Sequence, residues 1–203
     1  SMTEEIHEMV KTIKQSFRLM MNGVASSSMR EKGVVYKLNW GVPLTNLQEM
    51  ATSYGKNYEL AIELWKEDIR ECKIMATYIM PPEKMLPDMI DVWMEKVTTQ
   101  EIAEILVLNL LQYVDSAPVL AYQWIASDDI LRQITGYHLL SRLFMKKQEA
   151  NERGINEFVD HAATALQSDH VGLKHAAANC VYRFMDLGDA YEKIAQSTLG
   201  ALI

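Results

Sequence analysis

Apolar side chains recur at spacings of three and four residues along most of the chain, which is the pattern of amphipathic helices. Residues 3–22 show it first, with Ile6, Val10, Ile13 and Phe17 on one face. The prolines fall between such segments, and the β-branched alternation that is typical of strands is almost absent. The pattern therefore predicts an all-α protein.

Start and stop signals divide the pattern into about ten helices. The first is expected to end at Gly23, before a loop at residues 25–28. Proline in a first turn at Pro118 and an N-cap at Ser127–Asp129 open two later helices. The expected helices lie at about 3–22, 44–54, 57–67, 69–80, 83–96, 99–113, from 115 on, 129–147, 150–167, 170–186 and 189–201.

The helix at residues 99–113 is the most apolar of the set. Thr98 and Glu101 form a capping-box pattern at its start, with Thr98 as the N-cap. Its run Ile105–Leu108 is too apolar to face water. We therefore expect this helix at the buried centre of the protein.

Consecutive helices group into pairs near residues 57–80, 83–113, 115–147 and 150–186, each unit being roughly 30–40 residues long. This length is typical of HEAT-like repeats and predicts an α-solenoid (α-α superhelix) of stacked antiparallel helix pairs, with a concave face that binds something extended. We interpret residues 1–203 as one such domain, with Ser1 ahead of Met2 as a tag remnant. A compact helical bundle is the competing architecture, because no crisp motif repeats.

The charge balance is acidic, with a formal net charge of −7 and a pI near 5.3, which argues against strong non-specific binding of nucleic acid. A local basic face can still act within an acidic whole. Between Asp129 and Glu149 there is no acidic residue, while four basic side chains fall there. These are Arg132, Arg142, Lys146 and Lys147. The alternative is that they form only a solvated helix face.

Several classes of function find no support in the sequence. No apolar run is long enough to span a bilayer, and the polar N-terminus argues against a secretory signal. The two cysteines, Cys72 and Cys180, are far apart, which predicts a reducing, cytoplasmic location. The histidine spacing predicts no zinc site, and without a P-loop, GxGxxG or GxSxG motif we expect no metal and no cofactor.

One pair of acidic residues is a candidate for chemistry. Glu101 and Glu104 lie three residues apart at the start of the helix at 99–113, so they share a face, with Gln100 beside Glu104. The helix dipole alone is a sufficient structural reason for two carboxylates there. The functional alternative is that one carboxylate faces a groove and stabilises positive charge on a substrate.

Three stretches of the chain resemble the AlkD-like DNA alkylation-repair family. They are Ser26–Gly33 with Tyr36–Val42, then Leu60–Ala76, which is similar to the family's "LA-x-x-LW…E-x-(K/R)-x-x-A" helix pair, and Trp124–Asp128 ahead of a long helix. The resemblance implies a HEAT-like solenoid. It also implies an N-glycosylase that releases N3- or N7-alkylated purines from double-stranded DNA. In such enzymes a carboxylate stabilises the oxocarbenium-like sugar, aromatic side chains surround the lesion and an arginine contacts the backbone.

The resemblance assigns roles to individual residues. Glu104 takes the position of the catalytic aspartate and Glu101 that of a second aspartate, while Gln100 replaces a tryptophan. Ile134 stands where the family has an arginine, and Cys180 where it has a second tryptophan. Arg183, three residues beyond, matches an arginine of the family pattern.

Two hypotheses follow from these matches and departures. The first is a weak or altered DNA glycosylase, in which Glu104 stabilises the sugar and Arg132, Arg142, Lys146, Lys147 and Arg183 contact phosphates. The second is a non-catalytic HEAT-like scaffold that binds DNA or a protein partner on its concave face. The lost aromatic side chains and the acidic net charge motivate the second. The family likeness and the retained carboxylate motivate the first, and a DNA-repair-type role with doubtful catalysis is the leading interpretation.

Overall fold

The protein is all-α, as predicted. The computed structural model describes residues 3–203, and within that range it contains twelve α-helices, two short 3-10 helices and a single isolated β-bridge between Leu38 and Ile69. No helix in the described range is long and apolar enough to cross a membrane. The α-helices are α1 (Glu4–Met20), α2 (Gly23–Glu31), α3 (Leu44–Tyr54), α4 (Tyr58–Lys66), α5 (Arg70–Ile79), α6 (Pro87–Met94), α7 (Gln100–Asn109), α8 (Ala117–Ile125), α9 (Ile130–Met145), α10 (Glu152–Ala165), α11 (Val171–Met185) and α12 (Asp189–Leu199).

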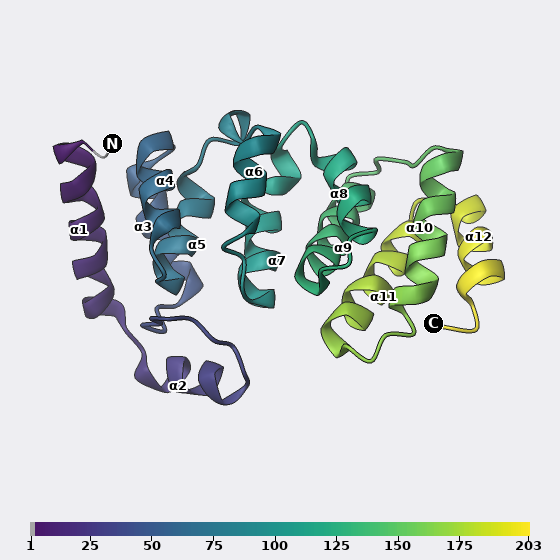
Figure 1. Ribbon diagram of the computed structural model, residues 1–203, viewed down its shortest axis with the longest axis horizontal. Helices are drawn as coiled ribbons and strands as arrows, with labels where there is room; N and C mark the ends of the chain where they lie inside the picture. Colours follow the sequence, from purple (N-terminus) through teal and green to yellow (C-terminus); the bar gives the residue numbers. More distant parts are fainter. Residues whose placement is uncertain (1–2) are drawn as a thin grey trace. The chain divides into compact units, whose positions relative to one another are not determined.

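Contacts between helices divide the chain into two compact units, one up to Leu110 and one from Leu111 to Ile203. The interpretation of the chain as one domain stays a prediction. In the first unit, α5 packs against α3, α4 and α7, and α1 packs against α4; Figure 1 shows these helices side by side, with α2 lying across their lower ends. Every residue of α5 except Tyr78 is buried, so α5 is the centre of this unit.

The centre of the first unit is therefore not the helix that the sequence indicated. The expected helix at 99–113 is shorter, because α7 ends at Asn109 and a 3-10 turn, η2 (Leu111–Tyr113), follows. Its N-cap is Thr99, whose hydroxyl accepts a hydrogen bond from the Ile102 amide, and not Thr98. Leu108 is 46% exposed, so the expectation that the whole apolar run avoids water is wrong at this residue.

Residues 23–31 form the helix α2, whereas a loop was expected at residues 25–28. The Asn22 side chain accepts a hydrogen bond from the Ala25 amide and so caps α2. Without this cap, that first-turn amide would have no acceptor within the helix. The segment after α2 returns against this cap at Gly41, where a Cβ would lie 2.1 Å from the Asn22 carbonyl oxygen. With a φ of +68°, Gly41 combines close approach with a left-handed conformation, and both favour glycine.

The second unit is built around α9 and α11. The helix α9 packs against α8 and α11, while α10 packs against α8, α11 and α12 (Figure 1). Phe144, Phe158 and Phe184 meet in its core, with neighbouring ring centroids 4.9–5.6 Å apart. Gly136 allows α8 and α9 to approach closely, since a Cβ there would lie 2.8 Å from the Ile125 nitrogen.

The predicted pairing of consecutive helices is found for α4 with α5, α8 with α9, and α10 with α11. It is not found for the pair expected at 83–113. There α6 and α7 share few contacts, and α7 packs mainly on α5. Of the second helices of these pairs, α5 is the most completely buried, whereas α11 keeps exposed residues along its length, such as His175 and Asn179.

Candidate nucleic-acid interface

Glu101 is held in a bidentate ion pair. The Nε and Nη2 of Arg70 donate to its Oε1 and Oε2 at 2.9 and 3.1 Å. The Tyr36 hydroxyl donates to Oε1 at 2.5 Å. The Glu101 side chain is 24% exposed, while Arg70 is only 2% exposed. The negative charge of Glu101 is therefore already compensated within the protein.

The same arginine links Glu101 to a second, fully buried carboxylate. Arg70 Nη1 donates to Glu71 Oε2 at 2.7 Å, and Glu71 is 0% exposed. The remaining acceptor sites of Glu71 take the backbone N–H groups of Trp40, at 3.0 Å, and Val42, at 3.2 Å. This network (Tyr36, Arg70, Glu71 and Glu101) fixes the segment that follows α2 onto α5 and α7.

The electrostatics of the network follow from burial and from the two carboxylates. Burial, then the charge and hydrogen bond of Glu101, raise the pKa of Tyr36, so its hydroxyl stays protonated and keeps donating. Burial alone would lower the pKa of Arg70, but the hydrogen bonds and charges of Glu101 and Glu71 outweigh it and raise that pKa. Both donors are thus locked in their donating forms.

Glu104 has a different environment from Glu101. It is exposed, and among residues 3–203 it has no ion pair or hydrogen-bonded partner. Gln100 and Leu108, one turn before and one turn after it, are also exposed, so the three form one surface stripe of α7. Ile102 and Leu106 point into the core, as predicted. The catalytic assignment of Glu104 and Glu101 stays a prediction.

Arg142 and Lys146 lie at the C-terminal end of α9, against the turn η2. Arg142 Nε donates to Gln112 Oε1 at 3.3 Å, and Lys146 Nζ donates to the Gln112 carbonyl oxygen at 3.1 Å. Lys146 Nζ also lies 4.5 Å from the centroid of the Tyr113 ring. Partial burial, then the neighbouring positive charge of Arg142, lower the pKa of Lys146.

Lys147 and Arg183 join this group through the end of α11. Lys147, the C-terminal neighbour of Lys146, has a φ of +64° and donates from Nζ to the Asp186 carbonyl oxygen at 2.9 Å. Arg183 forms a long ion pair with Asp186, at 3.9 Å, and its Nε is buried without a hydrogen-bonded partner in the described part of the chain. We call these four residues the basic cluster; they are Arg142, Lys146, Lys147 and Arg183.

Arg132, the fifth predicted phosphate contact, lies apart from the basic cluster. It is in the first turn of α9, where its backbone N–H is capped by the Asp129 carboxylate. Ten residues of helix separate it from Arg142, which is about 15 Å along the axis. The structure therefore brings four of the five predicted basic residues to one end of α9 and α11 and leaves Arg132 near the other.

Sequence reasoning missed the exposed Tyr113 and the buried Gln112, which contact the basic residues at the end of α9. Their separation from Lys146 in sequence is more than 30 residues, and only the packing of η2 on α9 brings them together. An aromatic residue two positions ahead of the polar residues Asp115 and Ser116 was the available signal. It carries little weight without the fold.

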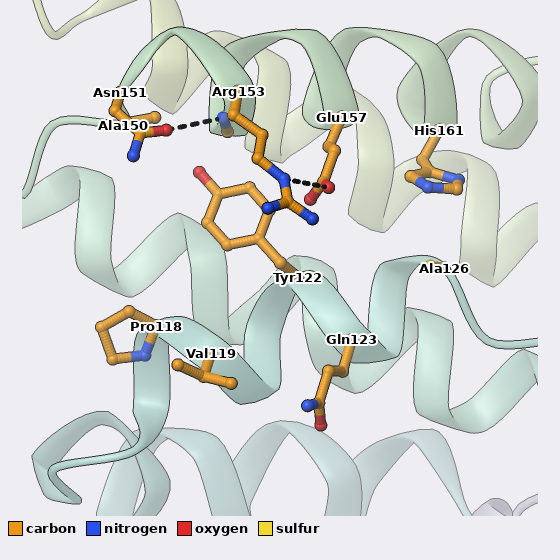
Figure 2. A pocket seen from close by; sticks show the side chains of 11 residues that line it. Pro118, Val119, Tyr122, Gln123, Ala126, Ala150, Asn151, Arg153, Glu157 and His161 are labelled. Atoms are coloured by element: carbon orange, nitrogen blue, oxygen red, sulfur yellow. Dashed lines mark hydrogen bonds and ion pairs between the residues drawn. The ribbon is translucent and has the colours of Figure 1, made fainter.

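The second unit also contains a groove between α8 and α10, with a volume of about 590 Å³. Figure 2 shows Arg153, Glu157 and His161 in a row along α10, with the Tyr122 ring of α8 next to Arg153. Arg153 Nε lies 3.3 Å from Glu157 Oε1. Gly154 leaves room for Tyr122, because a Cβ would lie 3.1 Å from the tyrosine oxygen. Burial raises the pKa of Tyr122 to about 12, so this hydroxyl is no general base near neutral pH.

No group of three or more potential metal ligands is present within residues 3–203, and the groove offers no site of that kind. The residues that line it come from α8, α10 and the turn before α10. The basic cluster, in contrast, lies on α9 and α11. The two features therefore belong to different helices of the second unit, and the groove contains none of the predicted site residues.

Comparison with known proteins identifies the family. No curated protein matches the chain. A solved structure matches with a TM-score of 0.81 at 20% identity, covering 93% of this chain and 82% of the other; it represents a new family of proteins related to the HEAT-like repeat DNA glycosylases, with affinity for branched DNA structures. This likeness confirms the predicted HEAT-like fold. The family pattern of the DNA alkylation repair enzymes matches residues 13–180, and the chain therefore belongs to the DNA alkylation repair enzyme family.

Proposed function

We propose that this protein binds DNA through the basic cluster, that branched DNA is its preferred form, and that binding rather than base excision is its main activity. The observation that carries the proposal is the gathering of Arg142, Lys146, Lys147 and Arg183 at one end of α9 and α11. A protein of the same fold has affinity for branched DNA structures, which supports branched DNA as the first form to test.

The cations of the basic cluster are poorly compensated by the protein itself. Lys146 and Arg142 hydrogen-bond to neutral oxygens of Gln112 rather than to carboxylates, and their mutual repulsion contributes to the lowered pKa of Lys146. Lys147 donates to a carbonyl, and Arg183 has one long ion pair. A bound phosphate would relieve this repulsion and supply the missing acceptors.

The residues at the positions expected to carry out base excision argue against efficient catalysis. They therefore favour DNA binding as the main activity. Glu101 is already paired with Arg70, so its charge is not free to stabilise a sugar cation. Ile134 and Cys180, which stand where the resemblance expects an arginine and a tryptophan, are both fully buried in α9 and α11. Neither side chain can reach DNA without unfolding its helix.

The test is a comparison of a four-way DNA junction with a linear duplex of the same arm sequence, by fluorescence anisotropy at one low salt concentration. We expect the junction to bind about tenfold tighter or more, since it combines phosphates from several arms. Equal affinities would contradict the preference for branched DNA. Absence of binding to both at low salt would contradict DNA binding altogether and favour a protein partner.

A second candidate function, glycosylase activity, is supported by Glu104, an exposed carboxylate with no partner in the described range. Because only the charge and not the aromatic surroundings is retained, we expect release of N3-methyladenine and N7-methylguanine from methylated DNA to stay close to the buffer control. The measurement is chromatography of released bases, with Glu104→Gln as the matched variant. Release well above the control that is lost in Glu104→Gln would establish this function in place of the first.

A further inference from the structure

We propose that Tyr113 is a stacking platform for an unpaired base, which gives the protein its preference for DNA that is not fully paired. This inference rests on the proposed DNA-binding function and adds to it a contact that reads the pairing state of the DNA. The residues that carry it are Tyr113, Gln112, Lys146 and Arg142, all in the second unit.

Tyr113 projects from a rigid anchor. It is the last residue of η2, and its neighbours Leu111, Gln112 and Val114 are buried, whereas Tyr113 is 58% exposed. Burial on both sides fixes the backbone of the turn, so the ring cannot withdraw into the core without moving them. A tyrosine held in this way presents a large contact surface and has only two side-chain torsions to order.

One cation lies beside the ring, and a second is held by the neighbouring residue Gln112. Lys146 Nζ lies 4.5 Å from the ring centroid, an attractive cation–π geometry, and its hydrogen bond to the Gln112 carbonyl oxygen holds it there. Arg142 is tied to the Gln112 side chain at 3.3 Å. One turn thus holds an exposed aromatic ring and two positive groups next to one another.

This combination fits a single nucleotide that has left the duplex. Proteins that bind single-stranded nucleic acid combine aromatic rings, on which bases stack, with cations that contact the backbone. In a paired duplex both faces of each base are covered by its neighbours, so the ring has nothing to stack on. An unpaired base at a bulge or a branch point offers a free face, and its flanking phosphates would lie within reach of Lys146 and Arg142.

The alternative role for Tyr113 is purely structural, in which its contact with Lys146 holds the end of α9. That role does not need the ring to be exposed, and the Gln112 carbonyl already fixes Lys146. The acidic residue closest in sequence, Asp115, is two residues away and also exposed, so the ring is not surrounded by a uniformly positive surface. Stacking on a base would supply the part of the binding energy that charge alone does not.

The experiment uses the full chain and two duplexes of identical length, one fully paired and one carrying a single bulged 2-aminopurine. The variants are Tyr113→Ala and, as the matched control that keeps the ring, Tyr113→Phe. For Tyr113→Ala we expect about a tenfold or greater loss of affinity for the bulged duplex and less than a twofold change for the paired one. The wild type and Tyr113→Phe should quench the 2-aminopurine fluorescence, and Tyr113→Ala should not.

Each outcome separates the two proposals. If Tyr113→Ala lowers both affinities equally, or leaves quenching unchanged, stacking by Tyr113 is wrong while DNA binding stands. If the wild type binds neither duplex at low salt but binds the four-way junction, stacking by Tyr113 is wrong and the proposed function stands. If it binds none of the three DNAs, the proposed function fails, and the inference fails with it. Thermal unfolding of Tyr113→Ala close to that of the wild type is expected, because the ring is mostly exposed, and it shows that lost stacking is not lost folding.

Discussion

Replacing Glu71 with alanine is expected to lower the free energy of unfolding by about 3–5 kcal/mol, the largest stability effect of any single substitution considered for this protein. Glu71 is 0% exposed and accepts hydrogen bonds from Arg70 and from the backbone amides of Trp40 and Val42. Its removal leaves the backbone amides of Trp40 and Val42 without their acceptor and takes away one of the two carboxylates that pair with Arg70. Urea denaturation followed by circular dichroism measures the change.

The matched control is Glu49→Ala, which removes the same side chain from an exposed position of α3. We expect it to change the free energy of unfolding by less than about 0.5 kcal/mol. A loss below about 1 kcal/mol for Glu71→Ala would contradict a structural role for the network. It would also reopen the assignment of Glu101 as a carboxylate that is committed to Arg70.

The largest expected effect on binding comes from neutralising the basic cluster. The cluster variant carries Arg142→Gln, Lys146→Gln, Lys147→Gln and Arg183→Gln. It should bind DNA on the order of a hundredfold more weakly than the wild type at low salt, because each lost phosphate contact also loses the release of its counterion. Fluorescence anisotropy with the four-way junction measures the loss.

The control for this variant changes the net charge by the same amount at other places. It replaces four exposed basic residues by glutamine; they are Lys11, Arg153, Lys174 and Lys193. Since long-range attraction depends on the total charge whereas phosphate contacts depend on position, we expect the control to lose less than about tenfold in affinity. Equal losses in the two variants would mean that the basic cluster has no special role.

The sequence pattern was a good guide to local structure and a poor one to long-range contacts. The Asp129 cap and the end of the long helix near residue 147 depend on neighbours in sequence, and the structure places α9 at Ile130–Met145. The sequence pattern assigned no role to the charged residues directly before Cys72. Glu71 among them is buried, because its partners are amides 29 and 31 residues away, which no local pattern reveals.

For the candidate site, too, local features could be predicted from the sequence, whereas long-range contacts could not. The absence of acidic residues between Asp129 and Glu149 predicted a basic segment, and the structure adds that its C-terminal part meets Arg183 through Asp186. The pairing of Glu101 with Arg70 could not be predicted, since the helix dipole was a sufficient local reason for that carboxylate. Tyr113 is exposed beside Lys146 only because η2 packs on α9.

The salt dependence of DNA binding tests the central claim most directly. Measured for the wild type and the cluster variant between about 50 and 200 mM salt, the slope of log affinity against log salt counts the phosphates that each protein neutralises, at about 0.9 per contact for duplex DNA. We predict a steep slope for the wild type and one shallower by about 3 or more for the cluster variant. Identical slopes for the two proteins would contradict the claim that these four side chains hold the DNA backbone.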